Sequence, residues 1–271
     1  MKTRLLTAAA LIPVLIVVVL FLPKLVMTLF LAAFSAIAAY ELLYRTGLVR
    51  HMRLVTYSAV MAFLVPLWCY FGMPYVWGLL GLLVFIAALF AEMMGNHIRL
   101  QFEKIALCFV GGLLIPYLFA ALIRILAPEL GRHIIMIPFV LAFLPDSGAY
   151  FAGYFFGKHK LAPVISPKKT VEGAVGGVLT AVLGMLLYGL IMDLFFSLEV
   201  NYLFAVLYGI IVSLGDIFGD LMFSVIKRQA GIKDYGNLFP GHGGILDRFD
   251  SVMIVAPLTE VLLILLPVVV V

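Results

Sequence analysis

The chain has 271 residues, of which 65% are hydrophobic and only 12% are charged, and its mean hydropathy is +1.20. A soluble domain is about half apolar and about a quarter charged, so this composition excludes a soluble globular protein and predicts an integral membrane protein. The net charge of +4 gives no reason to expect a nucleic-acid partner, because membrane orientation accounts for the basic residues.

Apolar stretches long enough to cross a bilayer, which takes about 20 residues each, recur along the whole chain. We expect nine of them, and therefore an all-α integral membrane protein of about nine transmembrane helices. The first follows Lys2 and Arg4 as in a secretory signal, but no small-residue cleavage site precedes Pro23, so we interpret it as a retained helix. The expected spans are Leu5–Leu22, Val26–Leu43, Leu54–Phe71, Val76–Ala91, Ile105–Ile125, Ile134–Phe151, Thr170–Phe195, Tyr202–Val225 and Ser251–Val271.

The basic residues predict the orientation of these spans. With a cytoplasmic N-terminus, fifteen of the eighteen Lys and Arg fall in cytoplasmic segments. Only Lys24, Arg124 and Arg132 fall outside. This bias predicts a cytoplasmic N-terminus and an outside C-terminus, as an odd number of spans also requires. We therefore expect a multi-pass protein of the cell inner (cytoplasmic) membrane.

The eighth span carries polar residues that are unusual inside a membrane. Ser213, Asp216, Asp220, Ser224 and Lys227 are spaced three or four apart, which places them on one face of a helix. An ionisable group in a span costs roughly 2.5–3.5 kcal/mol on insertion scales and indicates function. Two carboxylates one turn apart repel each other, and a cation such as Mg²⁺ would relieve this. The alternative is a buried carboxylate pair that shares a proton or faces a basic residue.

The segment that follows, residues 227–251, combines glycines, cations and carboxylates. Its glycine and proline density excludes a regular helix through Gly236–Gly244, and glycine N–H groups can turn toward an anion. Asp247 and Asp250 follow at the start of the last helix, where they could share one face. Together these residues predict a metal-bridged polyphosphate site. The candidate anion donors are Lys227, Arg228, Lys233, His242, Arg248, Gly241, Gly243 and Gly244.

A third segment is expected to join this site from the cytoplasmic end of the sixth span. Asp146 lies close to that membrane edge, and Lys158, Lys160, Lys168 and Lys169 follow it. Positive-inside topology alone could explain the lysines. The run Ser166–Thr170 is more specific, because two cations directly precede a helix start where Thr170 is a candidate N-cap and free N–H groups attract phosphate.

At these residues the chain resembles the phosphatidate cytidylyltransferase family, also called CDP-diacylglycerol synthases. The family signature reads S-x-x-K-R-x4-K-D, a short spacer, then P-G-H-G-G-x-x-D-R-x-D. Two upstream segments, Asp146–Gly153 and Ser166–Gly173, also match, as does a weaker N-terminal pattern with Arg4 and an A-Y-E-L run that ends at Leu42. The signature residues here are Ser224, Lys227, Arg228, Lys233, Asp234, Pro240, Gly241, His242, Gly243, Gly244, Asp247, Arg248 and Asp250.

The resemblance implies a reaction of phospholipid biosynthesis in which CTP and phosphatidic acid give CDP-diacylglycerol and pyrophosphate. It also implies a homodimer and a divalent metal, for which we expect Mg²⁺, and it leaves open a second cation such as K⁺. On this basis Asp220 and Asp247 are expected to bind Mg²⁺, with Asp146, Asp216 and Asp250 as further ligands or neighbours. The triphosphate is assigned to Lys227, Arg228, Lys233 and His242, and the lipid phosphate to Lys168, Lys169 and Arg248. Ser166 and Ser224 are expected to help position a phosphate.

Two other functions share part of this sequence pattern. CTP-dependent enzymes also act on prenyl lipids, and an apolar substrate tail leaves no specific sequence signal. A secondary transporter would also carry intramembrane carboxylates, but no inverted repeat accompanies them. We expect residues 1–133 to form a scaffold with lipid access and residues 134–271 to form the catalytic helices. Small-residue pairs such as Gly173 with Gly177 fit either packing within the chain or a dimer face.

Overall fold

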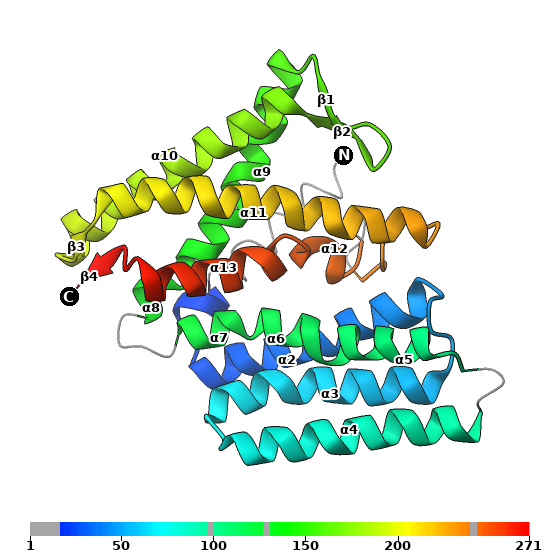
Figure 1. Ribbon diagram of the computed structural model, residues 1–271. Helices are drawn as coiled ribbons and strands as arrows, with labels where there is room; N and C mark the ends of the chain where they lie inside the picture. The colour runs from blue at the N-terminus through cyan, green and yellow to red at the C-terminus, as the bar shows by residue number, and fades with distance from the viewer. Residues whose placement is uncertain (1–16, 97–99, 127–130, 239–242, 271) are drawn as a thin grey trace. The chain divides into compact units, whose positions relative to one another are not determined.

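A computed structural model of the protein describes residues 17–96, 100–126, 131–238 and 243–270. The described chain is mostly helical (Figure 1). Seven helical segments within it are long and apolar enough to cross a membrane, and they correspond to the second to eighth expected spans. The helix content and these apolar segments are consistent with the expected all-α, multi-pass membrane protein. The seven segments are Lys24–Arg45, Met52–Phe71, Tyr75–Gly95, Phe102–Ile125, Gly131–Phe156, Val171–Phe196 and Tyr202–Gln229.

The chain forms two compact units that do not follow its order. The first unit contains residues 1–124 and 229–249, and the second contains residues 125–228 and 250–271. The polar segment after the eighth span therefore groups with the N-terminal helices. The functional division at residue 133 stays a prediction.

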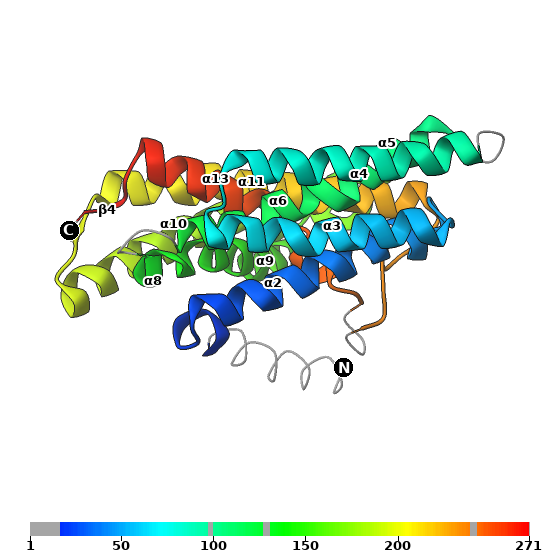
Figure 2. The ribbon, with the colours of Figure 1, turned by 90° about the horizontal axis from the view of Figure 1, so that it is seen from below.

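The first unit is a set of neighbouring helices, of which α2, α3 and α4 are seen side by side in Figures 1 and 2. Its core is formed by fully buried side chains that include Leu43, Leu54 and Leu89. The turn between α3 and α4 follows from local chemistry: α3 ends at Gly72, whose φ of 56° is left-handed, and Pro74 precedes α4. The elements are α2 (Lys24–Tyr40), the π-helical η1 (Glu41–Arg45), α3 (Met52–Phe71), α4 (Tyr75–Gly95), α5 (Phe102–Phe109), η2 (Val110–Leu114), α6 (Ile115–Phe119), α7 (Ala121–Ile125, the last residue of which belongs to the second unit) and α12 (Leu246–Phe249).

The second unit contains the longest helices. Small residues bring them close together: a Cβ at Gly173 would lie 2.9 Å from the Ala149 carbonyl oxygen of α9, and one at Gly215 would lie 2.7 Å from Leu258 of α13. These glycines therefore pack helices within the chain, as one of the two interpretations of the small-residue pairs expected. The elements are α8 (Gly131–Ile134), α9 (Met136–Phe156), β1 (Lys160–Ala162), β2 (Ser166–Thr170), α10 (Val171–Phe196), β3 (Glu199–Val200), α11 (Tyr202–Gln229), α13 (Val252–Leu265) and β4 (Val269–Val270).

Two short strand pairs join these helices. Strands β1 and β2 form an antiparallel hairpin in which Lys160 is opposite Thr170, and β3 pairs with β4. The residues Ser166–Thr170, predicted as a run that precedes a helix start, are thus a strand that leads directly into α10.

The last expected span is shorter than its apolar sequence suggests. Helix α13 has 14 residues, about 21 Å at 1.5 Å per residue, against about 30 Å for the hydrocarbon core. It ends before Pro267, because the residue that precedes a proline is disfavoured in helical conformation. The expected helix Ser251–Val271 is therefore not continuous, and most of Leu5–Leu22 lies outside the described residues. The count of nine spans is not confirmed, and the orientation of the termini stays a prediction.

Candidate active site

Helix α11 presents the expected polar face. It is continuous from Tyr202 to Gln229, so the five polar residues do share one side. Ser213, Asp216 and Ser224 are buried. The Ser213 hydroxyl donates to the Gly209 carbonyl of its own helix, which is a structural use of that side chain. The carboxylates and the lysine are the candidate chemical groups of this face.

Asp216 is the most deeply buried ionisable residue of this face, with 1% of its surface exposed. Its Oδ1 is buried and has no hydrogen-bond partner within the described part of the chain. The Ser251 side chain is hydrogen-bonded to the carboxylate, and Asp146, Lys169 and Asp220 are close enough to interact with it electrostatically. Leaving a buried carboxylate oxygen unpaired is costly. Such an atom is therefore a candidate ligand for a cation or a substrate group.

Two lysines lie against the neighbouring carboxylates. Lys169 Nζ forms an ion pair with Asp220 Oδ2. Lys227 Nζ lies 3.6 Å from Asp250 Oδ2, with the two side chains 12% and 10% exposed. The Asp250 carboxylate also accepts a hydrogen bond from the Ser251 N–H at 3.0 Å. The alternative in which carboxylates face basic residues is thus seen at Asp220 and Asp250.

The β1–β2 hairpin is held by contacts with α10 and α11, and its Lys169 pairs with Asp220. Thr170 caps α10, since its Oγ1 accepts the Gly173 N–H at 3.1 Å, as predicted. The Glu172 carboxylate lies 2.6 Å from His159 Nδ1 and also accepts the His159 N–H. Arg228 Nε donates to the Ile165 carbonyl at 3.3 Å. Ser166 is the first residue of β2, and Lys168 in the same strand is exposed.

In the first unit, two carboxylates organise the glycine-rich segment. Asp247 Oδ2 accepts the N–H of Tyr235 at 2.7 Å and that of Gly244 at 2.9 Å. The Glu41 carboxylate accepts the N–H groups of Ile245 at 3.2 Å and Leu246 at 2.9 Å. Since α12 begins at Leu246, Glu41 binds the free N–H groups that precede and open this short helix.

The glycines of this segment allow its close approach to the two carboxylates. Gly243 has a φ of 87°, and a Cβ there would lie 2.6 Å from Asp247 Oδ2. A Cβ at Gly236 or Gly244 would overlap the Glu41 carboxylate. The Gly244 N–H therefore holds a carboxylate of this chain. Phosphate binding by the glycine segment stays a prediction.

The remaining predicted residues of the segment are less constrained. Lys233 and Arg248 are exposed, as groups that grip a phosphate from solvent would be. Gly241 and His242 lie outside the described residues. Asp247 belongs to the first unit, whereas Asp146, Asp216, Asp220 and Asp250 belong to the second.

The donor set of the second unit suits a hard cation. Across the described ranges, no three His, Cys, Asp or Glu side chains form a metal-binding group by themselves. Mg²⁺ does not need such a cage, because it is typically held by one or two carboxylates together with substrate phosphates and water. The unpartnered Oδ1 of Asp216, with Asp146 and Asp220 nearby, fits a site of this open kind.

Comparison with known proteins decides the family. A model of the cytidylyltransferase family matches residues 2–266. The chain belongs to this family. Its relatives include proteins named phosphatidate cytidylyltransferase from Staphylococcus epidermidis and Staphylococcus saprophyticus, each 48% identical over 134 residues. One from Staphylococcus aureus is 47% identical over 134 residues. Each alignment covers 49% of this chain and 50% of the relative. The chain thus spans about half the length of the curated relatives it matches.

The sequence leaves the role of one residue near the signature segment, Glu41, undecided. Its position four residues before Arg45 fits either an ion pair one helical turn apart or a functional role. The structure shows instead that Arg45 donates to Asn237, while Glu41 binds the backbone before α12. A signal was present, because an acidic side chain at a helix C-terminus opposes the helix dipole. The π-helical turn that begins at Glu41 is a second feature common at functional sites.

Proposed function

We propose that this chain transfers the cytidylyl group of CTP to phosphatidic acid, giving CDP-diacylglycerol and pyrophosphate. The observation that carries the proposal is the neighbourhood of Asp216, Asp220 and Lys169 on α11 and β2 in a chain of the cytidylyltransferase family. Carboxylates beside lysines in the second half of a membrane helix suit a reaction between a soluble triphosphate and a lipid-anchored phosphate.

The chemistry requires alignment and charge neutralisation more than a general base. A phosphate monoester has a second pKa of about 6 and is already largely a dianion near neutral pH. One of its oxygens attacks the α-phosphorus of CTP. The bond from that phosphorus to the bridging oxygen breaks, and pyrophosphate leaves with the electron pair. Lys169 and Lys227 neutralise the phosphate oxygens, and exposed Lys168 and Arg228 extend the cationic surface.

Asp146, Asp216 and Asp220 are the residues proposed to hold Mg²⁺, with Asp250 beside Lys227 as a further candidate. When bound, the ion would neutralise triphosphate oxygens and the departing pyrophosphate. Binding of phosphate would also give Lys169 a second anionic partner besides Asp220. Asp247 Oδ2 already accepts the N–H groups of Tyr235 and Gly244. A direct contact between Asp247 and the metal therefore stays a prediction. A second cation such as K⁺ is part of the same prediction.

We place the site at the cytoplasmic face of the cell membrane. The distribution of Lys and Arg supports this orientation, with the N-terminus inside and nine spans in total. CTP is a cytoplasmic nucleotide, and the phosphate of phosphatidic acid lies at the headgroup layer. A polar cavity at the cytoplasmic helix ends, open to the inner leaflet, would admit both. The homodimer implied by the family resemblance is also a proposal, which the mass of the purified protein in detergent tests.

The position of the label that reaches the lipid tests the proposal. Purified protein is given CTP labelled at the α- or the γ-phosphate, together with phosphatidic acid, a polyprenol or a polyprenyl phosphate. We expect α-label in the lipid product CDP-diacylglycerol and γ-label in released pyrophosphate. Transfer of γ-label to a prenyl lipid would instead identify a kinase, and absence of pyrophosphate release would support a transporter. The Asp193→Asn variant is the matched control. Asp193 lies near the C-terminal end of α10, where it accepts a hydrogen bond from the Tyr202 hydroxyl, and it is not one of the proposed site residues.

A further inference from the structure

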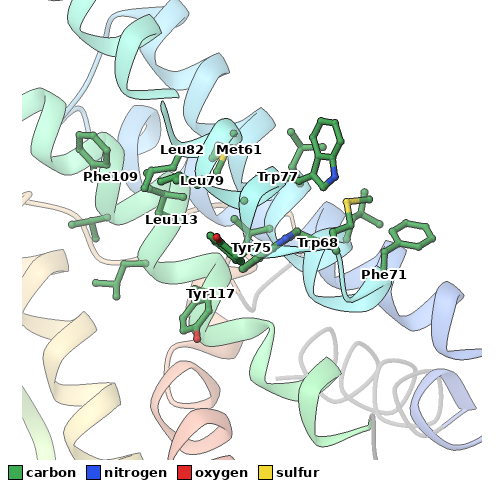
Figure 3. Close-up of a pocket in the computed structure, with 18 residues that line it drawn as sticks. Met61, Trp68, Phe71, Tyr75, Trp77, Leu79, Leu82, Phe109, Leu113 and Tyr117 are labelled. Carbon is green, nitrogen blue, oxygen red and sulfur yellow. The ribbon is translucent and has the colours of Figure 1, made fainter. Parts of the chain in front are cut away.

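The first unit contains an apolar pocket that no part of the proposed reaction uses. Its volume is about 920 Å³, and it lies among α3, α4, α5, η2 and α6 (Figure 3). This is near the upper end of the roughly 300–1,000 Å³ typical of small-molecule sites. The lining is almost entirely hydrocarbon and includes Met61, Trp68, Leu82, Leu113 and Tyr117. None of the predicted site residues lines it.

The pocket has the depth of one leaflet. Along α3 its lining runs from Met61 to Phe71, which is about 15 Å at 1.5 Å per residue. Half of a hydrocarbon core is also about 15 Å. Tyr75 and Trp77 line the pocket at the start of α4 and are 77% and 61% exposed. Amphipathic rings of this kind gather where a membrane meets water. The pocket therefore extends from a membrane interface toward the bilayer centre.

One polar group inside this lining needs an acceptor. Trp68 Nε1 is buried and has no hydrogen-bond partner among the residues that the structure describes. Its ring is held against α4, since a Cβ at Gly78 would lie 2.8 Å from it. A buried indole N–H without a partner is costly. A ligand that is apolar along most of its length but carries a carbonyl oxygen would satisfy it.

Cations lie at the same end of the unit. The Arg124 guanidinium is 4.4 Å from the ring centroid of Tyr117, which lines the pocket. Lys24 lies 5.8 Å from the centre of the Tyr70 ring, next to Phe71. Helix α2 begins at Lys24 and passes into η1 at Glu41, so this end of the unit is opposite the Glu41 end. Positive charge at an interfacial rim favours an anionic headgroup.

We propose that this pocket binds a phospholipid with an anionic headgroup, with one acyl chain along α3 and its ester carbonyl near Trp68 Nε1. Lys24 and Arg124 are predicted to lie on the outer side of the membrane, so, with the orientation of the proposed function, this lipid lies in the leaflet opposite the lipid substrate and is distinct from it. A second copy of the chain would offer apolar side chains to the lining, but hydrocarbon brings no acceptor to the Trp68 Nε1 donor.

Native mass spectrometry of the full chain in mild detergent tests the proposal, with phosphatidylglycerol and phosphatidylcholine as probes. Gly81 lines the pocket, and a Cβ there meets nothing within 4 Å, so Gly81→Leu should fill the pocket without strain. We expect it to bind phosphatidylglycerol at least about tenfold more weakly, because its side chain excludes two or more methylene groups. Gly95→Leu is the matched control: the same helix has open space there, outside the pocket lining.

Two further variants separate the parts of the ligand. Trp68→Phe should weaken ester-linked phosphatidylglycerol more than an ether-linked analogue, which lacks the carbonyl. Arg124→Gln should reduce the preference for phosphatidylglycerol over phosphatidylcholine. Wild-type binding by folded Gly81→Leu would overturn the proposal. A Gly81→Leu variant that binds lipid as the wild type does but shifts from dimer to monomer would also overturn it. That result would mean that a second copy of the chain covers the pocket.

Discussion

The carboxylate of Glu41 accepts a hydrogen bond of 2.9 Å from the backbone N–H of Leu246, 205 positions later in the chain. A second bond reaches the Ile245 N–H. Glu41 thereby fixes the start of α12, the helix that carries Asp247 and Arg248. It acts as a positioning residue for the signature segment through the backbone of that helix.

Removing this carboxylate should loosen the segment. Glu41→Ala leaves two buried N–H groups without their acceptor, and each such loss costs about 1–3 kcal/mol. We expect a lower unfolding temperature and faster amide hydrogen exchange at residues 243–247, with Glu41→Gln intermediate because it keeps one acceptor oxygen. Glu92→Gln is the control, as Glu92 in the same unit pairs with exposed Arg53. Unchanged exchange at residues 243–247 in Glu41→Ala would contradict the positioning role.

The glycines that face Glu41 should resist even a methyl group. A Cβ at Gly244 would overlap the Glu41 carboxylate, so Gly244→Ala must displace it or the loop, at about 1–3 kcal/mol for overpacking. We expect a loss of both stability and cytidylyl transfer. Gly95→Ala adds the same methyl group where nothing lies within 4 Å and should be neutral or slightly stabilising. Equal thermal stability of the two variants would contradict this expectation, because it would mean that the loop can accommodate the added methyl group.

The Lys227–Asp250 pair should behave as a coupled unit. Both side chains are mostly buried, so Lys227→Met removes the cation that faces the Asp250 carboxylate. Breaking such a pair from one side costs about 3 kcal/mol or more. We expect the double variant Lys227→Met with Asp250→Asn to be more stable than Lys227→Met alone, as measured by thermal unfolding in detergent. Additive losses in this double-mutant cycle would mean that the two side chains do not interact.

The sequence predicted the parts of the fold that depend on local pattern. The helical spacing from Ser213 to Lys227 and the N-cap at Thr170 needed only periodicity and capping chemistry, and both are confirmed. A helix break before Pro267 is also a local signal, whereas the apolar composition of residues 251–271 predicts a longer span. At this position the proline, and not the hydropathy, sets the end of the helix.

Partners far apart in the sequence were harder to predict. No local sequence pattern indicates the ion pair between Lys169 and Asp220 or the hydrogen bond from Arg45 to Asn237. The glycine-rich segment was expected to hold phosphate, whereas its described N–H groups hold Asp247 and Glu41. Glycine pattern indicates that backbone N–H groups turn toward an anion, but it does not identify the anion. That identity depends on tertiary contacts, which a single sequence does not display.

The buried carboxylates of α11 are proposed to serve CTP-dependent transfer to a lipid. The most direct test is the rate at which purified Asp216→Asn moves label from the α-phosphate of CTP to phosphatidic acid, with Asp193→Asn alongside. We expect Asp216→Asn to fold normally and to lose about a hundredfold or more in rate, as when a charge-stabilising group is removed from an active site. Asp193→Asn should keep the wild-type rate. A folded Asp216→Asn protein that labels phosphatidic acid as fast as the wild type would contradict the account.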